Sequence, residues 1–272
     1  PRVSVEVAYN RRWWGNFTVT DNQTLGPGDY ETWIATAPSD PRLPGGGGYQ
    51  IVEYEVKPEK SGLTPQNYVT FETDFGPPRK RYWNGVDVTG SARMSNGLTF
   101  QGGTSTGRNV TDRCASLVNI DSPNPRNCRT VLPFKTTFRG SASYTVPKID
   151  VLVSGTFRSD QGTPLQAQWV VSSAEAAKTL GRPLSGGAPN VTVNLLEPGE
   201  VWGDRVNVID LRLAKILRFG RTRTNVGVDV YNLFNSSAVL NYNQAYNPVG
   251  TWLTPTTVVQ GRFAKISASL DF

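Results

Sequence analysis

The sequence predicts an all-β protein, and in particular a segment of a transmembrane antiparallel β-barrel with about eight long strands. Three observations indicate this class. Eight segments alternate apolar and polar side chains in period two, over roughly ten residues each. The connections between these segments alternate between short and long. The 272-residue chain has no apolar run of about 18 residues, which excludes a transmembrane helix but not a transmembrane barrel.

The first strand is valine-rich, with Val3, Val5 and Val7 on one face and polar residues between them. The Asn-Gly dipeptide at 96–97 is a strong hairpin signal and separates the second strand from the third. A second tight turn is expected at 147–148, where proline follows a clear alternation. We therefore predict the first five strands over residues 2–14, 81–93, 98–106, 134–146 and 149–158.

The last three strands are a hairpin and a final single strand. Residues 206–217 and 223–234 flank a turn at 218–222, and the final strand covers 260–272. A chain that ends on an aromatic residue inside its last strand resembles the assembly signal of bacterial outer-membrane barrels. The residues predicted to carry this signal share one face of the strand and are Phe272, Leu270, Ala268 and Ile266, with Ala264 beside them.

Short turns at 94–97, 147–148 and 218–222 alternate with long excursions at about 15–79, 107–133, 159–205 and 235–259. This asymmetry is typical of outer-membrane barrels, in which the turns are periplasmic and the loops extracellular. Residues 172–181 begin with a capping box and end on glycine. They predict a short helix in an extracellular loop.

The two cysteines, Cys114 and Cys128, flank a proline-containing stretch in the second long excursion. An even pair that closes a small loop predicts a disulfide in an oxidising compartment, and two free thiols are the alternative. The chain has no histidine, so it has no Ser-His-Asp or Cys-His arrangement and few metal ligands. We expect no enzyme, no cofactor and no metal site. The net charge of +6 is spread along the chain, which argues against nucleic acid as a partner.

Two structural alternatives stay open. A soluble β-sandwich, jelly roll or propeller also has short alternating strands. However, charges such as Asp87, Arg139 and Asp229 fall in the middle of the polar faces, where a solvated lumen accepts them. The second alternative is a self-contained eight-stranded barrel. The long loops and a first residue, Pro1, that is not an initiator methionine favour a part of a larger barrel.

Several segments resemble the C-terminal part of TonB-dependent outer-membrane receptors. The most recognisable is Tyr231-Asn-Leu-Phe-Asn235 in the penultimate strand, supported by residues 203–215 and 261–272. Four further segments resemble the Oar-like branch, whose members carry an N-terminal carboxypeptidase-regulatory-like domain: 40–48, 81–88, 102–108 and 180–186. The resemblance covers nearly the whole chain, and it says little about the ligand.

The resemblance implies that residues 1–272 are the C-terminal part of a receptor β-barrel, with the plug domain and the N-terminal strands absent. The implied location is the bacterial cell outer membrane. The implied partners are outer-membrane lipid, the barrel-assembly machinery, the TonB complex acting through the absent N-terminal part, and a small-molecule or oligomeric ligand. The implied function is TonB-dependent uptake of a scarce siderophore, vitamin, oligosaccharide or peptide. A surface protein for adhesion or secretion without import is the competing function, and a soluble β-sandwich binding module is a third.

Candidate ligand-binding residues are those expected in the lumen or at the loops. Trp83 has the same parity as Arg81 and Asp87, and therefore points toward the lumen. Most other tryptophans, including Trp13 and Trp14, are more typical of the interfacial girdle of a barrel than of a ligand site. The predicted ligand-binding set is Trp83, Arg81, Asp87, Arg139, Trp169 and Trp202.

Overall fold

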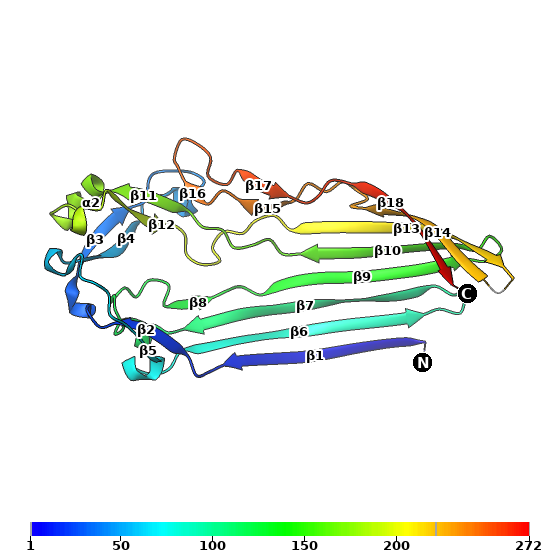
Figure 1. Cartoon of the computed structure of the whole chain (residues 1–272), viewed down its shortest axis with the longest axis horizontal. Helices are drawn as coiled ribbons and strands as arrows, with labels where there is room; N and C mark the ends of the chain where they lie inside the picture. Colours follow the sequence, from blue (N-terminus) through cyan, green and yellow to red (C-terminus); the bar gives the residue numbers. More distant parts are fainter. Residues whose placement is uncertain (1, 221, 272) are drawn as a thin grey trace.

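Eight long strands form one open antiparallel sheet in the computed structural model, which describes residues 2–220 and 222–271 (Figure 1). The eight strands are neighbours in chain order: β1 (Val3–Trp14), β6 (Lys80–Arg93), β7 (Thr99–Asp112), β9 (Lys135–Val146), β10 (Val151–Asp160), β13 (Val206–Phe219), β14 (Thr222–Tyr231) and β18 (Phe263–Asp271). The predicted all-β class and the eight strands are confirmed.

Several strand ends differ from the prediction by two or more residues; β10, for example, covers Val151–Asp160 instead of 149–158. Two of the differences have a clear cause. β7 continues to Asp112 instead of ending at 106, because it pairs with β6 along its whole length and with the short strand β8 (Arg129–Val131). β14 ends at Tyr231 instead of 234, because Asn232 adopts a φ of 51° and turns the chain. The Asn232 side chain fixes this turn by donating to the carbonyl oxygens of Ser236 and Gln260.

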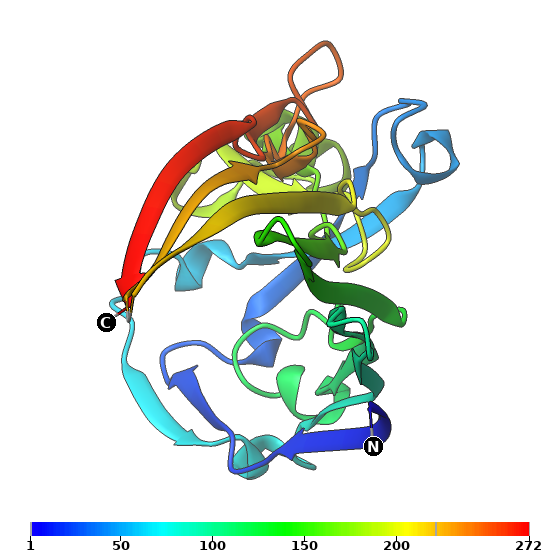
Figure 2. The ribbon, with the colours of Figure 1, turned by 90° about the vertical axis from the view of Figure 1, so that its right-hand side faces the viewer.

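β1 and β18 are the edges of the sheet, and within the described ranges they do not pair with each other. Viewed along the strands, the sheet curves into an open arc (Figure 2). The self-contained eight-stranded barrel is therefore not formed by the residues that the structure describes. β1 begins and β18 ends at the end of the sheet that carries the short turns (Figure 1).

The register between the eight strands is continuous, so alternate residues define two faces of the whole sheet. We call them the apolar face and the polar face. One cross-strand row of the apolar face runs through Val153, Leu213, Val228 and Ile266. The neighbouring row of the polar face runs through Arg212, Asp229 and Lys265. This arrangement follows directly from the period-two pattern of the sequence.

The four long excursions fold into a second part of the molecule at the other end of the sheet, which we call the loop layer (Figure 1). Its strands form four small sheets: β2 (Thr18–Asn22) with β5 (Asn67–Phe71), β3 (Tyr30–Thr36) with β4 (Gln50–Val56), β11 (Gln168–Ser172) between β12 (Asn190–Asn194) and β16 (Ala245–Tyr246), and β15 (Val239–Tyr242) with β17 (Pro255–Val258). Its helices are α1 (Cys114–Leu117), α2 (Ser173–Leu180) and the 3₁₀ turns Pro27–Asp29, Pro44–Gly46, Pro58–Lys60, Glu72–Phe75 and Ser185–Gly187.

The predicted helix at 172–181 is confirmed as α2. The Ser172 hydroxyl accepts a hydrogen bond from the Glu175 backbone N–H at 3.2 Å, and Gly181 closes the helix with a φ of 80°. Among the described residues, no helix combines the length and the apolar character needed to cross a membrane.

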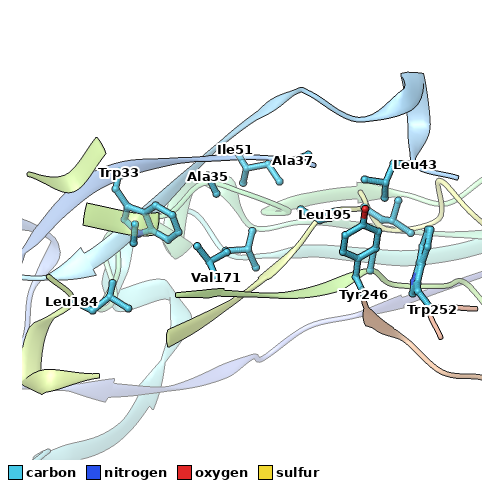
Figure 3. Close-up of a cluster of buried hydrophobic side chains, with 14 residues drawn as sticks. Trp33, Ala35, Ala37, Leu43, Ile51, Val171, Leu184, Leu195, Tyr246 and Trp252 are labelled. Atoms are coloured by element: carbon cyan, nitrogen blue, oxygen red, sulfur yellow. The ribbon is translucent and has the colours of Figure 1, made fainter. Parts of the chain in front are cut away.

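The main hydrophobic core lies in the loop layer rather than on the long sheet (Figure 3). Trp33 is 2% exposed and lies at one end of a buried cluster (Figure 3) whose other members come from β4, β11, α2 and the fourth excursion, among others. The buried members of this core come from three of the four excursions: Trp33, Ala35, Ala37, Leu43, Ile51, Ala167, Val171, Ala176, Leu184, Val193, Leu195, Leu196, Tyr246 and Trp252. The excursions are therefore one packed unit and not independent loops.

Arginine side chains tie the excursions together. Arg42 bonds the Asp40 carboxylate at 2.6 Å, donates to the carbonyl oxygens of Asn247 and Pro248, and lies 5.5 Å from the Trp252 ring centroid. Tyr246 donates to the same buried carboxylate at 2.9 Å. Arg42 holds the pKa of Asp40 well below its usual range, whereas burial and Asp40 raise the pKa of Tyr246 to about 12.

A second clamp uses Arg182, which bonds Glu31 at 2.6 Å and reaches the Val56 carbonyl oxygen at 3.2 Å. The clamp residues Arg42 and Arg182 lie within the segments 40–48 and 180–186. The conformation of the first segment also needs glycine. Gly47 has a φ of 80°, and a Cβ there would overlap the carbonyl oxygen of Pro38.

Candidate functional site

The polar face of the sheet carries charged side chains in partnered arrangements. Arg212 donates to both carboxylate oxygens of Asp229, at 2.8 and 3.0 Å, across β13 and β14. Asp210 accepts from the Asn232 backbone N–H at 2.8 Å. A hollow of about 830 Å³ lies over this face, lined by polar residues of every long strand from β1 to β14. The long sheet thus provides a wide polar surface on which charge is tolerated.

Three of the predicted ligand-binding residues, Arg81, Trp83 and Asp87, lie together on the polar face of β6, as their parity indicated. The Arg81 guanidinium stacks on the Trp14 ring at 5.0 Å. The Asp87 carboxylate accepts from the Asn10 side chain at 2.6 Å, and its Oδ1 is buried with no partner among the described atoms. These contacts join β6 to the edge strand β1.

The Trp83 ring lies flat across two paired glycines, Gly85 and Gly107. A Cβ at either position would overlap the indole. The two glycines therefore make room for the ring on the polar face, and a larger residue at either would displace it. A structural role for Trp83 explains these contacts as well as a ligand-binding role does.

Arg139 lies away from this group, on the polar face of β9. It is directly opposite Arg158 of β10, and its nearest carboxylate is Asp160 at 3.7 Å. A hollow of about 810 Å³ connects Arg139 and Arg158 with Asp87 and Asp210. Asp87 and Arg139 are thus the only two of the six predicted residues that line this hollow, within the described part of the chain.

Trp169 and Trp202 belong to the loop layer. Trp169 is in β11 and is partly buried against the core. Trp202 donates its indole N–H to the Gly199 carbonyl oxygen at 2.7 Å, and the Lys135 ammonium lies 3.8 Å from its ring centroid. The six predicted residues are therefore distributed over three places and do not form one site.

The loop layer contains a cleft of about 490 Å³ that the sequence did not indicate. It lies where β4 meets the second and third excursions, and its polar and aromatic lining consists of Tyr49, Gln50, Tyr54, Asn124, Arg126, Glu197 and Glu200. Tyrosine rings and hydrogen-bonding side chains around one cavity are typical of a small-molecule site. The two glutamates outnumber the single arginine, so the cleft suits a neutral or cationic ligand better than an anionic one.

Arg126 lines this cleft and links residues of three excursions. It bonds Glu53 at 3.1 Å, contacts Glu197 at 3.6 Å, and donates to the Asn194 carbonyl oxygen. Burial raises the pKa of Glu53, and the charge of Arg126 opposes this shift. Because Glu53 and Arg126 come from different excursions, only the folded loop layer brings them together.

The second excursion is closed by a disulfide between Cys114 and Cys128, whose Cα atoms lie 4.7 Å apart. The loop between them carries Asn124 and Arg126 into the cleft. Of the predicted assembly residues, Ile266, Ala268 and Leu270 lie on the apolar face of β18, with Ile266 80% exposed. Phe272 lies outside the described residues.

Searches against protein-family models, curated proteins and solved structures found no match for this chain. The geometry itself defines a class: an open antiparallel sheet with one apolar and one polar face, which carries a folded loop layer at one end.

Proposed function

We propose that this chain is part of a larger transmembrane β-barrel in the bacterial outer membrane, and that the barrel is a receptor for uptake of a scarce ligand. One observation carries the proposal. The apolar face is not covered by a second layer: exposure is 70% at Val5 of the edge strand β1, and still 47% at Leu213 and 42% at Val228 of the inner strands. In a β-sandwich this face would be buried against a second sheet, and in water it is an aggregation hazard. Contact with the hydrocarbon core of a membrane removes the free-energy cost of exposing these apolar side chains to water.

The dimensions of the sheet support the same conclusion. The 12 residues of β9 span about 41 Å along the strand, and about 29 Å along the membrane normal at a tilt of about 45°. This value is close to the thickness of the hydrocarbon core, about 30 Å. The unpaired edges of β1 and β18 support a larger barrel, because an open sheet edge is not stable in lipid.

The uptake function rests on the polar face, on the loop-layer cleft and on the resemblance to TonB-dependent receptors. In this proposal the polar face lines the lumen, where its paired charges stay hydrated. The cleft is the first contact for the ligand, and its glutamates and tyrosines favour a neutral or cationic molecule such as an oligosaccharide. The resemblance adds the partners: the barrel-assembly machinery, and the TonB complex as the source of energy.

Cysteine labelling on intact cells tests the location and orientation. Val249 is 92% exposed at the tip of the fourth excursion, and Ser95 is exposed in the turn between β6 and β7. The native cysteines are joined in a disulfide and do not react. A membrane-impermeant maleimide should label Val249→Cys on intact cells, and Ser95→Cys only after the outer membrane is permeabilised. Equal labelling of both variants in a soluble fraction would establish a soluble protein instead.

Energised uptake separates a receptor from a surface protein for adhesion or secretion. Accumulation of a ligand should depend on both this protein and a functional TonB complex. The alternative result is a strain that lacks this protein, loses surface attachment and takes up the ligand as before, with or without TonB. That result would identify the adhesion function.

A further inference from the structure

The apolar face carries a polar row near the loop layer. Arg11 of β1, Asn84 of β6 and Arg108 of β7 are consecutive register partners, so their side chains project side by side from the same face. Neighbouring strands are about 4.8 Å apart, which places the two arginines about 10 Å apart along the row. Two arginines side by side on a face that is mainly apolar require an explanation.

Aromatic rings surround this row. Arg11 stacks on Tyr82 at 4.9 Å, and Arg108 stacks on Phe134 at 4.6 Å. Trp13, two residues beyond Arg11, is 73% exposed, and Phe134 is 52% exposed. Exposed aromatic residues beside arginines are typical of the zone where the hydrocarbon core meets the lipid headgroups.

The row has no balancing negative charge. Asp112 is the single carboxylate on the apolar face in the described residues, and it contacts Arg129 at 3.8 Å, beyond the row. The Nε of Arg108 has no hydrogen-bond partner among the described atoms. By register the two arginines and the asparagine project from the same face, and each guanidinium stacks on an aromatic ring, although the Nε of Arg108 itself is buried.

We propose that the Arg11–Asn84–Arg108 row binds the phosphate of an anionic lipid headgroup in the leaflet next to the loop layer. This inference rests on the proposed membrane location of the sheet. Arginine is well suited to phosphate because its planar fork donates two parallel hydrogen bonds. The stacked rings hold the guanidinium groups in place, so less side-chain freedom is lost when a headgroup binds.

Native mass spectrometry tests the proposal on the intact protein, released from nanodiscs that contain equal amounts of phosphatidylglycerol and phosphatidylcholine. The test variant is Arg11→Gln with Arg108→Gln. The control variant is Lys215→Gln with Arg139→Gln, which removes the same charge. Lys215 is on the apolar face at the opposite end of the sheet, and Arg139 is on the polar face. Circular dichroism and heat-modifiability on gels verify that each variant is folded.

The proposal predicts that phosphatidylglycerol is retained in preference to phosphatidylcholine, and that each arginine contributes about five-fold to this preference. The test variant should lose the preference and the control should keep it. Equal preference in all three proteins would overturn the headgroup site while leaving the membrane location intact. Failure of the native protein to enter nanodiscs would overturn the membrane location, and this inference with it. Arginine-dependent binding of inorganic phosphate in the absence of lipid would assign the row to a soluble anion.

Discussion

Ala142 and Ser141 provide a matched test of the two faces, because they are adjacent and exposed in the middle of β9. Ala142 lies on the apolar face between Phe100 and Gly155, and Ser141 lies on the polar face between Gln101 and Thr156. Arginine at the middle of a lipid-facing surface costs about 2–4 kcal/mol. Ala142→Arg should therefore lower the ratio of folded to unfolded protein about 30-fold to 900-fold in lipid. Ser141→Arg should change stability by less than about 0.5 kcal/mol.

Urea unfolding in lipid vesicles, followed by tryptophan fluorescence, measures both free energies. If the sheet stayed in water with its apolar face uncovered, the two variants would behave alike, because both side chains would be exposed to solvent. Equal losses at the two positions, or no loss at either, would refute the assignment of the apolar face to lipid. Ser143 is a poorer control, because its hydroxyl is hydrogen-bonded to Thr99 at 2.6 Å.

Four further outcomes are expected. Cys114 and Cys128 should resist alkylation in unreduced protein from native membranes, and replacing both with serine should remove about 3 kcal/mol of local constraint; alkylation of both without reductant would contradict the disulfide. Trp33→Ala should destabilise the loop layer by about 3–5 kcal/mol, seen as faster proteolysis of the excursions while the long strands stay protected. The lowered pKa of Asp40 means that its contribution to stability is complete above its ordinary value of 3.8 and is lost as the pH falls toward the lowered pKa; near-ultraviolet dichroism should report this loss in the native protein and not in Asp40→Asn. Phe272→Asp should reduce the amount of protein in the outer membrane at matched transcript level, and an equal yield would argue against an assembly signal.

The long strands were predictable because their signal is local. A strand with two different environments alternates side chains in period two, and each residue of β9 or β18 reveals its face without reference to any other segment. The helix α2 was predictable for the same reason, since helix caps are set by a few neighbouring residues. The end of β7 was not, because its last residues depend on pairing with β8, which is distant in sequence.

The loop layer could not be predicted, because its stability comes from contacts between excursions. Trp33 shows no periodicity that distinguishes it from a surface residue of an edge strand, yet its side chain is only 2% exposed. The cleft likewise forms only through contacts between excursions. Arg126 meets Glu53 and Glu197 only after three excursions have packed, and nothing in the spacing of these residues indicates their proximity.

The folded loop layer also changes how the segments 40–48 and 180–186 are interpreted. At the sequence level they indicated a branch of a receptor family, and in the structure their arginines clamp one excursion to another. Gly47 is required by the close approach of Pro38, and Arg42 by a buried carboxylate that would otherwise have no cation beside it. Such residues preserve the shape of the loop layer whatever the ligand is. If the chain is the proposed receptor, ligand specificity is expected to reside in the cleft residues outside these clamps, and not in the segments that carry the family resemblance.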